Sequence, residues 1–364
     1  MLNYDKSRFE RIFRDSSNER EILVHNASFF QDTLKRFKKN KGAVVGLIVI
    51  TIVLFFSLIG PFMNSYKYDQ VMTEYEKLPP RIPIVEKLGI LDGTIVETKT
   101  KARAKINPDY ERIVKEYVVN GKEMVDVERN IYKQKGFDDI YFWFGTDTLG
   151  RDQWTRVWTG TRVSFYIAFL AVLIDMVIGI TYGMISGYKG GRTDTIMQRV
   201  VEIIVGIPRL VIVTLLVLVL NPGLMSITLA LIITGWIGMS RVVRSQVLKL
   251  KSFEFILASR TLGSSDSQII IKDILPNIFG QVLVMSMFSV PSAIFYESFL
   301  AFIGLGLQPP MASLGVLISD GYKSIMVYPH MLLYPVVILA LLMLTFNLLA
   351  DGLRDALDPK MKEE

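Results

Sequence analysis

The sequence predicts an all-α protein of six transmembrane helices, with a small mixed α/β insertion between the first two. Three observations predict this class. The 364 residues are 51% hydrophobic, with a mean hydropathy of +0.36. Only 21% of the residues are charged, against about 25% in an average soluble domain. Uncharged runs of about 20 residues, the length that crosses a bilayer, recur between strongly charged segments.

The first predicted span covers residues 43–63, which carry no charge. It follows the basic run Lys35 to Lys41, and a basic helix over Lys35 to Val45 leads into it. A signal peptide is the alternative, but the apolar run starts too far from the N-terminus and has no small-residue cleavage site. Because basic flanks stay inside, we expect residues 1–42 to form a cytoplasmic amphipathic segment.

Five further apolar runs complete the predicted bundle, and the tight turn Asn221-Pro222-Gly223 separates two of them. Alternation across the membrane places both termini inside, with residues 354–364 as a cytoplasmic tail. The short external loops contain almost no Lys or Arg and the internal loops contain many, which agrees with the positive-inside rule. The predicted spans are residues 162–188, 200–220, 224–242, 278–298 and 331–351, with an internal loop at 189–199 and an external one at 299–330.

The long external segment, residues 64–161, predicts a small domain followed by a charged motif. Val118 to Val125 is a hairpin signal, because Asn120-Gly121 suits a two-residue type I′ turn. Thr94 to Lys99 predicts a further strand. A domain of about 80 residues can form only a thin core.

Composition excludes several kinds of function. The chain has no Cys and only two His, His25 and His330, so we expect no metal site and no thiol chemistry. It lacks the G-x-x-x-x-G-K-[ST] phosphate loop. The charges in the spans are isolated rather than clustered, which argues against a membrane-embedded enzyme, and no catalytic residue is predicted. The net charge of +6 lies on the internal segments, while residues 64–161 are neutral overall. We therefore interpret it as an orientation signal rather than a nucleic-acid site.

The most informative stretch is the internal loop at residues 243–277. Its spacing predicts a helix over Gln246 to Leu262, with Val247, Leu250, Phe253 (or Glu254) and Leu257 on one side. Gly263 ends this helix as a C-cap glycine would. Ser265 and Gln268 form a capping-box pattern that begins a second helix, which Pro276 closes. This pair of helices is either a surface loop that joins two spans or a projection that fits a groove in a partner protein.

The same loop resembles the EAA loop of ABC importer permeases. In that pattern Glu-Ala-Ala is followed by three residues, Gly, nine residues and roughly Ile-x-Leu-Pro. The chain matches it at Ala258, Gly263, Leu275 and Pro276, and departs from it at Leu257, Ser259 and Asp273. The resemblance implies that the loop contacts an ATPase subunit. The residues expected to take part in this coupling are Glu254, Leu257, Ala258, Ser259, Leu262, Gly263, Leu275 and Pro276.

A second motif is similar to the signature before the second span of C-type permeases of peptide importers. It consists of Gly145, Thr146, Asp147, Gly150, Arg151 and Asp152, followed by Arg156 and by Gly160 to Ser164. The two glycines permit tight turns. Asp147, Arg151 and Asp152 predict a charge network that either ties the outer mouth together or docks a substrate-binding protein. The resemblance covers about residues 29–70 and 141–358, so it leaves the role of residues 71–140 open.

The resemblance implies one permease subunit of a type I ABC importer, for oligopeptides first and for dipeptides or nickel as alternatives. Its partners would be a second homologous permease, two ABC ATPases that hold the ATP and Mg, and an external substrate-binding protein. The chain itself would hold no cofactor and would lie in the cytoplasmic membrane. A sensor or scaffold, whose external domain binds a ligand, is a less favoured alternative.

Charged residues inside spans are costly, so they are candidates for the translocation path. Asp175 lies near the middle of the second span, and Arg209 follows Pro208, which is expected to kink the third. The alternative is that both face other helices or the partner permease. Glu202 and Glu297 are expected at interfaces. The repeat Gly179, Gly183 and Gly187 predicts a close helix-packing face rather than a ligand site.

Overall fold

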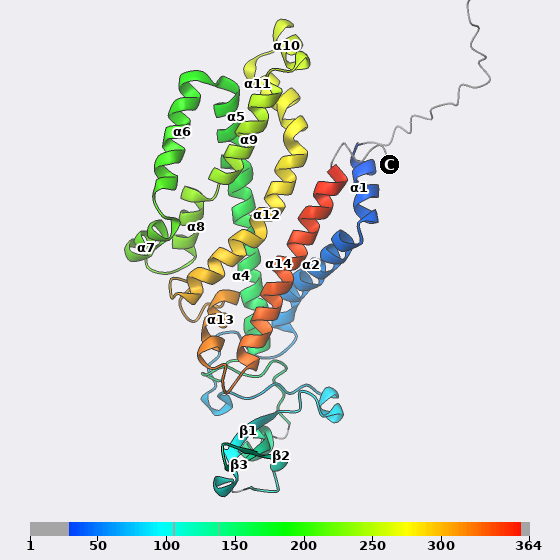
Figure 1. Ribbon diagram of the computed structural model, residues 1–364, viewed down its shortest axis with the longest axis vertical. Helices are drawn as coiled ribbons and strands as arrows, with labels where there is room; N and C mark the ends of the chain where they lie inside the picture. The colour runs from blue at the N-terminus through cyan, green and yellow to red at the C-terminus, as the bar shows by residue number, and fades with distance from the viewer. Residues whose placement is uncertain (1–28, 105, 138, 358–364) are drawn as a thin grey trace, which may run out of the picture.

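The computed structural model describes residues 29–104, 106–137 and 139–357. The N-terminal residues 1–28, with His25, and the end of the tail, 358–364, therefore lie outside the described residues. Helices run roughly along one long axis, and a small sheet lies at one end of the molecule (Figure 1). The described chain is mostly helical, which confirms the predicted fold class.

The long helices are α2 (Lys41–Ile59), α4 (Gln153–Ile174), α5 (Ile180–Lys189), α6 (Gly191–Gly206), α7 (Arg209–Leu220), α8 (Leu224–Thr234), α9 (Ile237–Leu250), α12 (Leu275–Phe302) and α14 (His330–Leu357). The shorter ones are α1 (Phe29–Lys39), α3 (Ile131–Lys135), α10 (Glu254–Thr261), α11 (Asp266–Gln268) and α13 (Leu314–Lys323). Two π-helical turns, Asp175–Gly179 and Ile269–Ile274, join α4 to α5 and α11 to α12.

Among the described residues, five continuous helical stretches are long and apolar enough to cross a membrane. A bent pair, α6 and α7, supplies a sixth span if the two are counted as one. The apolar side chains of α2 are largely exposed, as they are on a helix that faces lipid rather than a protein core. The continuous stretches are Lys41–Phe62, Gln153–Lys189, Leu224–Leu250, Asp266–Phe302 and His330–Leu357.

The third span bends by 75° between α6 and α7. Ile207, which precedes Pro208, has the extended backbone (ψ 122°) that a following proline favours, and Pro208 has no N–H to continue the ladder. The expected kink is therefore present. Most of the segment expected as an internal loop, residues 189–199, is already helical, because α6 begins at Gly191.

Several other helix ends differ from the predicted ones. The second span starts at Gln153 rather than 162, because Asp152 caps it, and the fourth runs on to Leu250 rather than 242. Pro276 does not end a helix. It lies in the first turn of α12, directly after a π-helical turn. The basic helix expected over Lys35 to Val45 is interrupted at Asn40, which caps α2, and α14 extends to Leu357, into the predicted tail.

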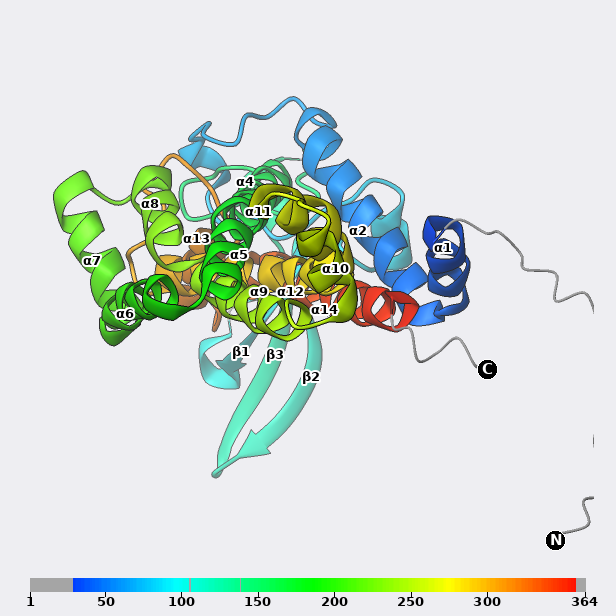
Figure 2. The same ribbon diagram turned by 90° about the horizontal axis from the view of Figure 1, so that it is seen from above.

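The described part of the insertion, residues 64–151, contains a three-stranded antiparallel sheet in the order β1-β3-β2. Its strands are β1 (Thr94–Thr100), β2 (Glu111–Val119) and β3 (Lys122–Asn130). Asn120 and Gly121 form the predicted two-residue turn, with positive φ at both positions and Val119 opposite Lys122. Figure 2 shows that the sheet projects beyond the outline of the helices.

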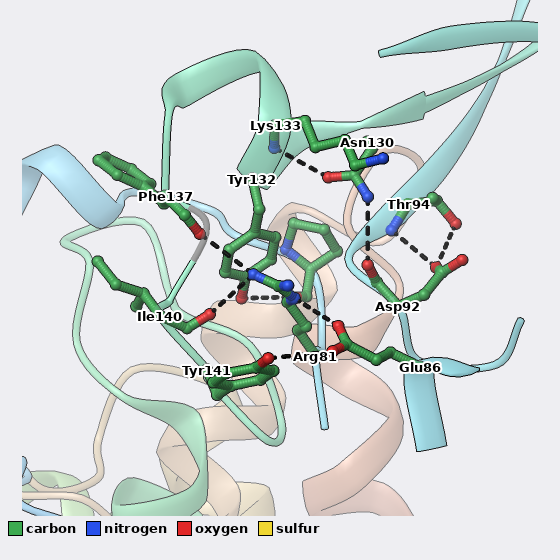
Figure 3. Close-up of polar contacts among 11 residues, drawn as sticks. Arg81, Glu86, Asp92, Thr94, Asn130, Tyr132, Lys133, Phe137, Ile140 and Tyr141 are labelled. Atoms are coloured by element: carbon green, nitrogen blue, oxygen red, sulfur yellow. Dashed lines mark hydrogen bonds and ion pairs between the residues drawn. The ribbon is translucent and has the colours of Figure 1, made fainter. Parts of the chain in front are cut away.

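Arg81 ties this sheet to the rest of the insertion (Figure 3). Its Nε lies 2.7 Å from the Glu86 carboxylate, and its guanidinium donates to the carbonyls of Phe137 and Ile140. The guanidinium also lies over the rings of Tyr132 and Tyr141. Tyr132 is buried and donates to the Pro79 carbonyl at 2.9 Å. The Arg81 cation therefore bonds to several segments that lie next to the base of the sheet.

The stripe of glycines on α5 and the turn before it packs closely against α9, as predicted. A Cβ placed on Gly179 would lie 2.7 Å from the Met239 Cβ, and one on Gly187 would lie 2.8 Å from the Val247 Cβ. At such distances no side chain fits at these glycine positions unless α9 moves. This contact joins the second span to the long fourth one.

Candidate functional site

Residues 251–268, which we call the knuckle, lie at the end of the molecule opposite the sheet (Figure 1). The sequence predicts one helix over Gln246 to Leu262, but α9 ends at Leu250 and α10 starts at Glu254. The three residues between them change the direction of the chain. The knuckle therefore consists of two short helices, α10 and α11, held between two long ones, each of which continues into a predicted span.

The tip of the knuckle is formed by Leu262 and Gly263. Gly263 has φ +84°, and its N–H donates to the Arg260 carbonyl, so it caps α10 as predicted. A Cβ added to Gly263 would meet no described atom within 4 Å, so only backbone strain would oppose a side chain there. Ser265 and Gln268 then form the predicted capping box at the start of α11.

The inner face of the knuckle is an apolar contact with the long helices. Ile256, Ile269 and Ile274 are fully buried and pack in one cluster with Val247 of α9 and Ile278 of α12. Leu257, which the spacing places on the same side as Val247, is exposed while Val247 is buried, because the break after α9 rotates α10. The knuckle is thus fixed to both α9 and α12.

The outer face of the knuckle is apolar and open. Leu262 at the tip is 86% exposed, and Phe253, Phe255 and Leu257 are exposed beside it on α10 or just before it. Large apolar side chains held outward in this way are typical of a surface that a partner covers. Of the predicted coupling residues, Glu254, Leu257, Ala258, Leu262, Gly263 and Pro276 are exposed, while Ser259 and Leu275 are half-buried.

Polar bonds connect the knuckle to the end of α5. The Tyr188 hydroxyl donates to the Asp266 carboxylate at 2.9 Å and accepts from the Arg260 guanidinium at 3.2 Å. Lys251 donates to the Gly187 carbonyl at 2.9 Å. Tyr188 was not among the predicted site residues, and its position at the end of an apolar run gave no signal for this role. The knuckle is therefore bonded to the second span as well as to α9 and α12.

A second polar cluster joins α5, α6 and α9 nearby. The Arg244 guanidinium forms two bonds, at 2.6 and 2.5 Å, to the Asp194 carboxylate. Ser186 of α5 donates to the same carboxylate. A bidentate pair of this kind fixes the relative orientation of two helices. The start of the bent span therefore moves with α5 and α9.

The motif at residues 145–152 is a buried turn at the opposite end of the helices. The Asp147 carboxylate accepts from the backbone of Leu149 and Arg151, and pairs with the Arg151 guanidinium at 2.7 Å. Arg156, which is 1% exposed, lies 3.4 Å from the same carboxylate. Gly145 and Gly150 both have positive φ. The predicted charge network is present between Asp147 and Arg151, but its third member is Arg156 and not Asp152.

Asp152 belongs to a different set of contacts. Its carboxylate caps α4 by accepting from the Thr155 backbone, and it also accepts from Asn64, close to the end of α2. The hydroxyl of Thr146 accepts from the Leu78 backbone and donates to the Tyr75 carbonyl. Asp152, Thr146 and Thr155 are buried and Asn64 is half-buried, so these contacts favour the structural tie over direct docking of a partner.

Asp175 and Arg209, the predicted residues of the translocation path, line one cavity between the helices. Its volume is about 180 Å³, and it is bordered by α4, α7, α8 and α12. The Ser289 hydroxyl donates to the Asp175 carboxylate. The Arg209 guanidinium lies 4.0 Å from the centre of the Tyr296 ring. Sequence reasoning did not identify Ser289 or Ser292, the hydroxyls that also line this cavity.

The backbone is irregular around this cavity. Asp175 begins a π-helical turn, and Arg209 begins α7 directly after the bend at Pro208. Gly235, which also lines the cavity, lies at the break between α8 and α9. Interrupted helices inside a membrane are tolerated where they line a cavity or are buried in protein. The charged residues and the helix interruptions therefore lie around the same cavity.

The other charged residues in the spans lie elsewhere. Glu202 is exposed on α6 and pairs with Arg199 at 2.6 Å, which suits an interface. Glu297 is fully buried within α12 rather than at its end, so its expected position at an interface is wrong. Among the described residues, no group of three His, Asp or Glu side chains could hold a metal ion.

Comparison with known proteins identifies the family. Residues 179–363 match the binding-protein-dependent transport system inner membrane component family, and residues 28–80 match the N-terminal TM domain of oligopeptide transport permease C. The chain is 36% identical to the oligopeptide transport system permease protein OppC of Bacillus subtilis over 363 residues, 100% of each chain.

Other relatives are named for dipeptides. The dipeptide transport system permease protein DppC of Bacillus subtilis is 38% identical, over 92% of this chain and 87% of the relative. The DppC protein of Lactococcus lactis is 40% identical, over 96% of each chain. The helical fold, the apolar spans and these matches together show that the chain belongs to the family of binding-protein-dependent transport system inner membrane components.

Proposed function

We propose that the chain is a permease subunit of an ATP-driven importer that carries oligopeptides across the cytoplasmic membrane. The observation that carries the proposal is the knuckle. It presents an open apolar tip and is bonded to three long helices at once. The names of the relatives, which are permeases for oligopeptides and dipeptides, support peptides as the substrate class.

In this proposal the knuckle and the described end of α14 face the cytoplasm, and the sheet faces outward. The positive-inside distribution of Lys and Arg supports this orientation. The partners would be a second homologous permease, two ATPase subunits and an external substrate-binding protein. ATP and Mg would be held by the ATPases, since the sequence has no phosphate loop.

The coupling would be mechanical. Movement of an ATPase surface would displace Leu262 and the rest of the knuckle as a rigid body. The Tyr188 bonds and the buried isoleucines would carry that displacement to α5, α9 and α12. Since α9 packs on the glycine stripe of α5, the two helices would tilt together. A bundle with two packed arrangements would then open its cavity to one side at a time.

The translocation path would include the cavity that contains Asp175 and Arg209. Charged groups inside spans are retained where they contact substrate or ions or pair with each other. The motif at residues 145–152 would hold the outer mouth together while the knuckle end moves, because it links α4 to the segment that follows α2.

The experiment is to express the chain with its neighbouring transporter subunits and to purify it through a tag on this chain. Co-purification of an ATPase, together with uptake of labelled peptides into vesicles loaded with the complex, supports the proposal. Peptides of graded length separate an oligopeptide importer from a dipeptide importer. Purification without any ATPase, or uptake of nickel but not peptides, contradicts it.

A further inference from the structure

We propose that the cavity between α4, α7, α8 and α12 is a subsite for the C-terminal carboxylate of a peptide, and that Arg209 is the residue that receives it. This inference rests on the proposed function and names the part of the substrate that the site would recognise. The argument depends on three properties of the cavity: its charges, its unsatisfied donor and its size.

The two charged residues of the cavity are not equivalent. The Asp175 carboxylate already accepts a hydrogen bond from Ser289. The Nε atom of Arg209 is buried and has no hydrogen-bond partner among the described residues. Arg209 as a whole is half-buried, but its Nε is shielded from water. A shielded donor without a partner is costly, so a ligand that accepts from it gains free energy on binding. Asp175 therefore already has a donor, whereas Arg209 still needs an acceptor.

Asp175 lies in the same cavity and repels an anion, but the groups next to Arg209 favour one. Arg209 is the first residue of α7, where the helix dipole adds partial positive charge. Tyr296 holds the guanidinium from one side through its ring face, which supplies no competing hydrogen-bond acceptor. A guanidinium binds a carboxylate through two parallel bonds, which makes this class of anion a good geometric match.

Size limits which part of a peptide can enter. The cavity has a volume of about 180 Å³ and is open on one side, so it can receive one end of a peptide while the rest of the peptide lies outside it. The lining by Ala171, Leu231, Met285, Phe288 and Ala293 is apolar and offers no specific partner for a side chain. Recognition would thus rest on the carboxylate, which every unmodified peptide carries whatever its sequence.

The test uses the absence of cysteine in this chain. Ser292 lines the cavity, so Ser292→Cys places one thiol of this chain at the site. The complete transporter is reconstituted in nanodiscs without its binding protein, and the rate at which a maleimide labels this chain is measured. Trialanine, trialanine amide and acetate are added as competing ligands.

We expect trialanine to slow labelling, while trialanine amide requires about tenfold higher concentration for the same effect because it lacks the charged acceptor. Each further substitution is combined with Ser292→Cys. Arg209→Gln should remove the difference between the two peptides, and Arg209→Lys should keep part of it. Arg199→Gln, on the surface of α6, should leave it unchanged. Equal protection by the two peptides, no protection, or a difference that survives Arg209→Gln overturns the inference. Acetate at the same concentration measures how much a carboxylate alone contributes to the protection from labelling.

The proposed function is tested separately in the same preparation. ATP-driven peptide uptake by the wild-type complex is measured with its binding protein present. The result of this assay does not depend on the labelling experiment. If uptake is observed and protection does not depend on the carboxylate, only the assignment of Arg209 fails. If no peptide is taken up, the proposed function fails on its own measurement.

Discussion

The hydroxyl of Tyr188 donates a 2.9 Å hydrogen bond to the carboxylate of Asp266, which joins the last turn of α5 to the second helix of the knuckle. The same hydroxyl accepts from Arg260 of α10. One buried side chain therefore contacts both arms of the knuckle. This contact gives a specific route by which movement of the knuckle reaches the second span.

Replacing Tyr188 by Phe removes the hydroxyl and keeps the ring. Two hydrogen bonds are lost, worth together on the order of 1–2 kcal/mol, so we expect peptide uptake per ATP hydrolysed to fall about 5- to 30-fold. Uptake and hydrolysis are measured on the same proteoliposomes. Tyr166→Phe, on an exposed residue of α4, is the matched control and should leave the ratio unchanged. An unchanged ratio in Tyr188→Phe contradicts the proposed route.

Gly263 at the tip of the knuckle should tolerate Asn much better than Val. A β-branched residue resists φ +84°, whereas Asn adopts the left-handed region readily, and there is open space for either side chain. Gly263→Val should abolish most uptake at a normal level of membrane-inserted protein, and Gly263→Asn should retain most of it. Quantitative immunoblots of membranes accompany the uptake assay. Normal uptake by the Val variant would show that the tip conformation does not matter.

The glycine contact between α5 and α9 should be sensitive to a single methyl group. A Cβ on Gly183 would lie 2.5 Å from the Ser240 carbonyl oxygen, so Gly183→Ala forces the helices apart, at a typical overpacking cost of about 1–3 kcal/mol. The melting temperature of the purified protein should fall by several degrees. Gly206→Ala, at a position with open space and an ordinary helical backbone, should leave it nearly unchanged. Equal melting temperatures for the two variants would argue against close packing.

Breaking the buried turn before α4 should impair folding. Asp147→Asn leaves the cations of Arg151 and Arg156 buried without their carboxylate, which typically costs about 3–5 kcal/mol. We expect a marked drop in the amount of inserted, detergent-stable protein, as seen by fluorescence-detected gel filtration. Asp109→Asn, on an exposed residue of the insertion, is the control. A normal elution profile for Asp147→Asn would contradict a structural role for the motif.

The base of the sheet should loosen in acid. The Arg81 guanidinium, bonded at 2.7 Å, holds the pKa of Glu86 below its usual value, and the Tyr141 hydroxyl adds to the effect. Because the folded pKa is lowered, the stabilisation is present above the usual Glu pKa of about 4.3 and is lost as the pH falls through the folded value. The protection factors of residues 94–130, in which the intrinsic pH dependence of hydrogen exchange is divided out, should therefore fall below about pH 4. Glu86→Gln should give faster exchange at pH 7 and a weaker pH dependence, and an unchanged profile would contradict the assignment.

Local signals in the sequence were sufficient for several elements. Gly263, the Ser265–Gln268 capping box and the Asn120-Gly121 turn were predicted because their conformations depend on residues a few positions apart. The same holds for the kink at Pro208. The glycine stripe was recognised because its four-residue spacing puts every member on one helix face.

Contacts between distant segments could not be predicted in this way. Tyr188 and Asp266 are 78 positions apart, and Ser289 and Asp175 are 114 apart, so neither pair has a sequence pattern. Helix ends were misplaced for a related reason. Hydropathy marks the apolar core of a span, whereas α4 and α9 continue through polar residues that are held by caps and by packing against neighbours.

The central claim is that the tip of the knuckle contacts an ATPase subunit. It is tested most directly by replacing Leu262, the 86% exposed residue at the tip, with a photo-reactive phenylalanine in cells that contain the whole transporter. Leu218, 79% exposed on α7, is the control position. We predict a covalent adduct of this chain with an ATPase subunit at Leu262 and none at Leu218. An ATPase adduct at Leu218, or the absence of one at Leu262, would contradict the account.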